Sequence, residues 1–185
     1  MRIQHLLATS ALLLALAPLA GCGLPGSSTS GATQGKLDTC ALLSNADVAT
    51  AIGEAVKDGQ PGLSNEGDAN TATFSECRYP LASDPDGVRK VSVFVRRSPV
   101  NDNTPAAIDQ VRQSMRDNFN AKLTNISGIG DTAFWAVYFS GRQLHVFKGA
   151  NLYLFVTMPS IFPDNAATLA KAKALAQKTL DKLAL

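Results

Sequence analysis

The sequence predicts a single α+β domain in which an antiparallel sheet of about five strands has helices packed mainly on one face. Two observations support this fold class. Segments with the alternation of strands follow one another through short turns, so that they must pair antiparallel. Segments with helical periodicity give the order helix, two strands, helix, three strands, helix. The domain is expected to span residues 37–185, and with 45% hydrophobic residues it can bury one core.

The first helix is predicted within residues 40–56, "CALLSNADVATAIGEAV". Ser44 is the expected N-cap, because Asp47 three residues later completes a box-like pair with it. Gly53 suits the C-terminal end of this helix. Residues 57–72 are rich in Gly, Asn and Asp, so they are expected to form a long loop.

Two strands are predicted next, over residues 72–81 and 88–98. In the second strand, Val91, Val93 and Val95 alternate with other residues and therefore share one face. The segment that joins the two strands carries turn residues, which makes the strands antiparallel neighbours.

The second helix is predicted over residues 103–120, with Thr104 as its N-cap and Pro105 in the first helical position. Residues 121–127, "AKLTNIS", are interpreted as the exit of this helix and a short loop. The helix should bury one apolar face, formed by Ile108, Val111, Met115 and Phe119.

A meander of three strands follows, over residues 132–140, 142–149 and 151–159, with glycine-containing turns between them. The last helix is expected to begin near Asp164. Its buried side should consist of Leu169, Ala172, Ala176, Leu180 and Leu183.

The segment "GIGDTAFW", residues 128–135, fits one form of the dinucleotide-binding fingerprint, G-x-G-x-x-A. That motif needs a strand before it and a helix after it, and here the following segment is strand-like. We therefore expect a turn and no cofactor. Gly128 and Gly130 would allow backbone angles closed to other residues, and Asp131 would bond the turn.

The N-terminus has the features of an export signal. A short basic start is followed by an apolar run from Leu6 to Leu16, which is too short to span a membrane. The run leads to Leu19-Ala20-Gly21-Cys22, which resembles the lipobox of bacterial lipoproteins in all four positions. The resemblance implies cleavage after residues 1–21 and acylation of Cys22. Residues 22–36 are then the lipidated cysteine and a flexible Gly/Ser/Thr tether.

The cysteine count agrees with this interpretation. If Cys22 of the three cysteines carries lipid, Cys40 and Cys77 remain, and outside the cytoplasm these two are expected to form a disulfide. The alternative is a two-cysteine metal site, but neither the spacing nor a histidine cluster supports one.

A second resemblance covers roughly residues 38–184. The Cys-x-Leu-Leu start at Cys40, the "CRYP" strand, the Gly-x-Gly-Asp-x-Ala turn at Gly128 and a Lys/Ala-rich last helix resemble a family of uncharacterised bacterial lipoproteins familiar from actinobacteria. The resemblance implies a disulfide-linked α+β domain on a lipid anchor. It implies no activity and brings no catalytic residues with it.

Charge and histidine content narrow the function classes. Of 17 Lys and Arg residues, Arg2 lies in the signal, which leaves 16 basic against 15 acidic side chains and no basic face for nucleic acid. His145 is the one histidine after the signal, which excludes a metal site with several histidine ligands. No G-x-S-x-G elbow accompanies it, so we expect a strand-surface residue rather than a catalytic base.

The meander is apolar on both of its faces. One face holds the helices, and the other is either covered by the remaining helix and the long loop, which we favour, or partly open as a groove for a ligand or partner. This second face carries five aromatic residues: Phe134, Tyr138, Phe147, Tyr153 and Phe155.

Three functions remain open. The favoured one is a non-enzymatic binding or accessory domain of the cell envelope, exported and lipid-anchored, with an envelope protein as its expected partner. The membrane would be the cell membrane, or the outer membrane facing the periplasm in a Gram-negative cell. The second is a carrier or sensor of a small apolar or lipid ligand, which would use the aromatic face. The third is a hydrolase that uses His145.

Overall fold

The computed structural model describes residues 36–183, which lie within one compact unit, Gly31–Leu185. The predicted signal peptide, the predicted lipidation site Cys22 and the tether up to residue 35 lie outside the described residues. Within the described part, no helix combines the length and the apolar character needed to cross a membrane.

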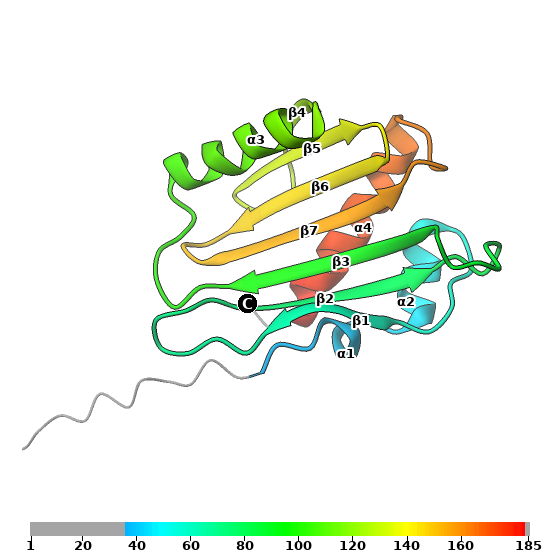
Figure 1. Ribbon diagram of the computed structural model, residues 1–185, viewed down its shortest axis with the longest axis horizontal. Helices are drawn as coiled ribbons and strands as arrows, with labels where there is room; N and C mark the ends of the chain where they lie inside the picture. The colour runs from blue at the N-terminus through cyan, green and yellow to red at the C-terminus, as the bar shows by residue number, and fades with distance from the viewer. Residues whose placement is uncertain (1–35, 184–185) are drawn as a thin grey trace, which may run out of the picture. The chain divides into compact units, whose positions relative to one another are not determined.

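The described residues form one antiparallel sheet of seven strands with four helices, so the predicted α+β class is confirmed. The strand order across the sheet is β1-β2-β3-β7-β6-β5-β4 (Figure 1). The elements are α1 Thr39–Leu42, α2 Asn45–Ile52, β1 Gln60–Asn65, β2 Thr73–Pro80, β3 Lys90–Arg97, α3 Pro105–Phe119, β4 Lys122–Ile126, β5 Thr132–Tyr138, β6 Gly141–Lys148, β7 Leu152–Pro159 and α4 Ala166–Lys182.

The predicted number of five strands is wrong, because the two edge strands, β1 and β4, were not predicted. β1 lies inside the expected loop 57–72, and β4 lies in the segment interpreted as a helix exit. The side chains of both strands are mostly exposed, so neither shows apolar alternation. β1 even contains Pro61 and Gly62, and it is a strand only because it pairs with β2.

Three helices pack on one face of the sheet, called here the inner face. Figure 1 shows α4 crossing behind the strands, and α1 and α2 lie on the same side. The valines Val91, Val93 and Val95 are fully buried in this core, as their alternation predicts. The predicted capping box of α2 is present: the Ser44 hydroxyl accepts from the Asp47 N–H, and the Asp47 carboxylate accepts from the Ser44 N–H.

Helix α3 packs on the opposite face, called here the outer face. Ile108 and Met115 are buried against the sheet side chains Phe134 and Phe147, which form a second, smaller core. Phe119, at the end of the predicted apolar stripe, remains half exposed. In Figure 1, α3 runs along β4 and β5 and leaves the half of the sheet around β2 and β3 without a helix on this side.

The predicted disulfide between Cys40 and Cys77 is present and joins α1 to the middle of β2. It closes a loop with a sequence separation of 37 residues. In the chain-entropy description, such a cross-link stabilises the folded state by about 4 kcal/mol. The short helix α1, which is too brief to show a period in the sequence, is thereby fixed to the sheet.

The turn at Gly128 and Gly130 has the predicted left-handed backbone, with φ of 77° and 59°. At Gly130 a Cβ atom would lie 2.5 Å from Val146 Cγ1, so this position also needs glycine for space. The Asp131 carboxylate accepts hydrogen bonds from the Gly149 N–H and from Lys148, and so holds the neighbouring β6–β7 turn. The motif is thus a structural junction of the meander.

Candidate binding groove

Side chains on the outer face stand in rows that cross several strands. Residues that are Cα partners on neighbouring strands lie side by side on the same face. One row is polar throughout and runs from β2 through β3 and β7 to β6. This polar row consists of Arg78, Ser92, Thr157 and Gln143.

The next row, two residues away along each strand, is mainly aromatic. It begins with Glu76 on β2 and continues with Phe94, Phe155, His145 and Phe134. This set is called the aromatic row. Two residues further away, a third row contains Phe74, Arg96, Tyr153 and Phe147.

The rings of the aromatic row stack on one another across the strands. The ring centroids of Phe94 and Phe155 are 4.7 Å apart with an interplanar angle of 11°, a separation that matches the spacing of neighbouring strands. On its other side Phe94 stacks on Phe74 at 5.7 Å. Because β2 and β7 flank β3 on opposite sides, these two rings stack with Phe94 from its two sides, which leaves mainly the ring edge for contact in the groove.

Helix α3 divides the five aromatic residues that the sequence singled out. Phe134 and Phe147 are buried beneath α3, and Tyr138 and Tyr153 pack against the same cluster with part of their surface exposed. Phe155 is outside that cluster and lines an open groove. The outer face of the sheet is thus covered by α3 over one half and open over the other half, around β2 and β3.

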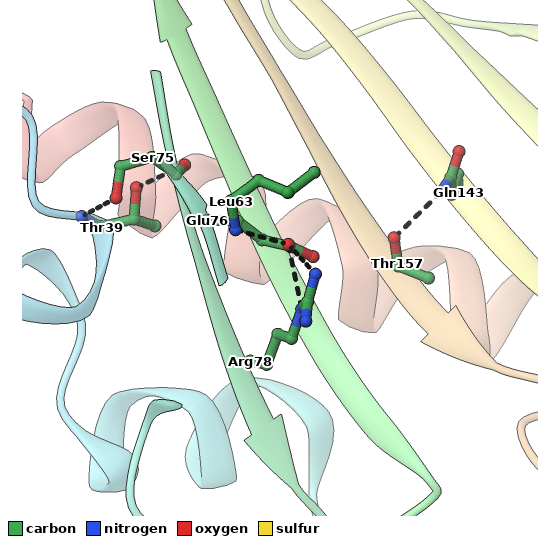
Figure 2. Close-up of polar contacts among 7 residues, drawn as sticks. All are labelled: Thr39, Leu63, Ser75, Glu76, Arg78, Gln143 and Thr157. Atoms are coloured by element: carbon green, nitrogen blue, oxygen red, sulfur yellow. Dashed lines mark hydrogen bonds and ion pairs between the residues drawn. The ribbon is translucent and has the colours of Figure 1, made fainter. Parts of the chain in front are cut away.

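The open half forms a groove of about 650 Å³. Its apolar lining is Leu63, Phe94 and Phe155. Its polar lining comprises the whole polar row together with Glu76 and Lys90. Figure 2 shows several of these polar side chains, which project from β2, β6 and β7.

Two hydrogen-bonded groups fix the polar lining of the groove (Figure 2). The Glu76 Oε2 atom accepts from Arg78 Nη2 at 2.6 Å and from the Leu63 N–H of β1 at 3.3 Å. Partial burial alone would raise the pKa of Glu76, but these hydrogen bonds and the charge of Arg78 hold it below its usual value. The Gln143 amide donates to the Thr157 hydroxyl at 3.1 Å. Glu76, Arg78, Gln143 and Thr157 are therefore held in place before any ligand arrives.

Phe94 and Leu63 line the groove, and Phe74 stacks on Phe94; the sequence analysis missed all three. The alternation on β3 could have identified Phe94, because the pattern that buries the valines on one face places Phe94 on the other face. Leu63 gave no signal, since it lies in a strand that only its pairing with β2 reveals.

His145 is not the strand-surface residue that the sequence predicts. It is only 2% exposed, and its ring stacks on Phe134 with centroids 4.4 Å apart. Its Nδ1 atom shares a hydrogen bond of 2.7 Å with the Tyr153 hydroxyl. Burial lowers the pKa of His145 to about 3, so the ring is neutral near pH 7. The sequence does not reveal this burial because it comes from tertiary packing: the rings of Phe134, Tyr153 and Phe155 surround the imidazole, and α3 packs on Phe134 in turn.

A smaller cavity of about 310 Å³ lies beside the first turn of α3, where Arg96 and Asp102 form an ion pair next to Tyr153. Within residues 36–183, no three His, Cys, Asp or Glu side chains are grouped in a way that would hold a metal ion.

No protein-family model, curated protein or solved structure matches the chain. The groove and its lining are therefore the basis on which a function is inferred.

Proposed function

We propose that the protein is a membrane-anchored, extracytoplasmic lipoprotein whose domain binds a ligand or partner in the outer-face groove and has no enzymatic activity of its own. The observation that supports this best is the groove itself. Its volume of about 650 Å³ falls in the range of small-molecule sites. Its combination of ring edges with fixed polar groups is also typical of such sites.

Export and anchoring are inferred from the N-terminal sequence and the cysteines. Acyl chains on Cys22 would hold the protein to a membrane, and the tether that follows would give the domain a reach of about 20 Å. The Cys40–Cys77 disulfide supports export, because disulfides persist in oxidising compartments. The membrane is the cell membrane, or the outer membrane facing the periplasm in a Gram-negative cell.

The surroundings of His145 argue against a hydrolase. A general base must come within hydrogen-bonding distance of its substrate. His145 is buried among aromatic rings, neutral, and hydrogen-bonded at Nδ1 to Tyr153. It is the only imidazole after the predicted signal, so no other histidine can take the role.

The groove is tested with a neutral apolar fluorophore, N-phenyl-1-naphthylamine, and the chain from residue 23 onward, which contains the compact unit with both cores and the disulfide. Leu63→Glu places a charge on the rim of the groove at a side chain that is 63% exposed. Val100→Glu is the matched control at a loop residue that is 58% exposed and outside the groove. We expect the first variant to lose fluorophore binding and the second to keep it. Equal binding by both variants would contradict the proposal.

The anchor is tested separately by feeding cells labelled palmitate. The wild-type protein should incorporate label and Cys22→Ala should not. Label on both proteins, or on neither, would refute acylation at Cys22 without affecting the groove.

A further inference from the structure

We infer that the occupant of the groove is a single-chain anionic amphipath, that is, one apolar chain that ends in a carboxylate or a phosphate. The inference rests on the proposed function, which makes the groove a binding site. The chain would lie parallel to the strands, with its anionic end beside Lys90 and its apolar part on Phe94 and Phe155.

Along β3 and β7 the lining of the groove changes from charged or polar to apolar, whereas β2 contributes the ion pair of Arg78 and Glu76 beside these residues. Lys90 stands at the start of β3, Ser92 of the polar row follows two residues later, and Phe94 of the aromatic row two residues after that. At about 3.3 Å per residue, the distance from Lys90 to Phe94 along the strand is about 13 Å. A molecule lying along β3 therefore meets first a cation, then hydrogen-bonding groups, then ring edges.

The charge at the Lys90 end is positive. Lys90 is exposed and forms no ion pair with any residue in the range 36–183. The carboxylate of Glu76 is neutralised by Arg78, with an N–O distance of 2.6 Å. Glu76 also lies in the aromatic row, at the far end of the groove from Lys90. The end that Lys90 marks is thus complementary to an anion.

The apolar end suits a flexible chain better than a flat ring. A nucleobase or a sugar ring that stacks flat on an aromatic residue needs a free ring face, and Phe94 already stacks with Phe74 and Phe155. Methylene groups can pack on ring edges without this requirement. The floor is only two rings wide, because His145, the next ring of the aromatic row, is buried. This width favours one chain over two.

The test measures displacement of N-phenyl-1-naphthylamine from the chain starting at residue 23, by oleate, methyl oleate and oleoyl lysophosphatidylglycerol below their micelle concentrations. We expect oleate, the lysolipid or both to displace the fluorophore at concentrations at least tenfold lower than methyl oleate. Lys90→Glu should weaken displacement by the anionic probe at least tenfold more than it weakens displacement by methyl oleate. Lys122→Glu is the matched control, an exposed lysine on the opposite edge strand β4.

The results separate this inference from the proposed function. Displacement by oleate alone points to a free fatty acid, and displacement by the lysolipid alone points to a phosphate headgroup. Either outcome supports the inference. It is overturned if the methyl ester competes as well as the anions, or if Lys90→Glu and Lys122→Glu behave alike. The groove would then still be a site, provided that Leu63→Glu abolishes binding of the fluorophore. If Leu63→Glu leaves that binding intact, the proposed function itself fails.

Discussion

Folding stability should fall between pH 7.5 and pH 5.0 because His145 is buried in its neutral form. The pKa of this imidazole is about 3 in the folded state and about 6.5 in the unfolded chain. Between these two pKa values the unfolded chain binds more protons than the folded protein, so the free energy of unfolding rises with pH. The stability that the neutral imidazole contributes is lost progressively as the pH falls below 6.5. Since pH 5.0 lies 1.5 pH units below the unfolded pKa, the free energy of unfolding at pH 5.0 should be about 2 kcal/mol lower than at pH 7.5.

Urea unfolding of the chain from residue 23 at pH 5.0, 6.0 and 7.5 measures this effect. His145 is the only histidine in that chain, so replacing it removes the titration. His145→Phe keeps a ring against Phe134, although it leaves the Tyr153 hydroxyl without its partner, which costs stability by an amount that does not change between pH 5.0 and 7.5. Carboxylates contribute equally to both proteins. A wild-type protein as stable at pH 5.0 as at 7.5, or a variant with an undiminished pH dependence, would refute the buried, neutral state of His145.

Two further predictions concern stability at constant pH. Replacing Cys40 and Cys77 together by alanine should lower the free energy of unfolding by about 4 kcal/mol in urea titrations, and a loss below about 1 kcal/mol would show that the cross-link hardly constrains the unfolded chain. Gly149→Ala should lower the free energy of unfolding by about 1 kcal/mol, and Gly130→Ala should lower it by clearly more. Both glycines have positive φ, but only at Gly130 does a Cβ atom meet Val146 and the backbone of Phe147, whereas nothing lies within 4 Å at Gly149. Similar melting temperatures for the two variants would contradict this account of the turn.

The predictable parts of the fold are those in which local chemistry and burial agree. Ser44 with Asp47, and Thr104 with Pro105, mark the starts of α2 and α3 because capping involves neighbours along the chain. The buried valines of β3 follow from alternation alone. Both edge strands were missed because their side chains are largely solvated and only pairing with a neighbouring strand makes them extended.

The sequence predicts which face of the sheet carries the aromatic residues of the candidate site, but it does not predict which part of that face is open. The face of Phe134, Phe147 and Phe155 can be derived from parity within each strand. Which part of that face is covered depends on where α3 packs, and no residue pattern within α3 specifies its position over β5 and β6. For the same reason His145 could be assigned to a face, but its burial could not be anticipated.

The proposed function requires that the half of the outer face left open by α3 is a binding site. Backbone amide chemical shifts recorded during titration with N-phenyl-1-naphthylamine test it most directly. We expect perturbations concentrated on β3 and β7 around Phe94 and Phe155, with the amides of Ser92 and Thr157 beside them, and little change along α4. Perturbations spread evenly over the surface, or concentrated on the inner-face helices, would contradict it.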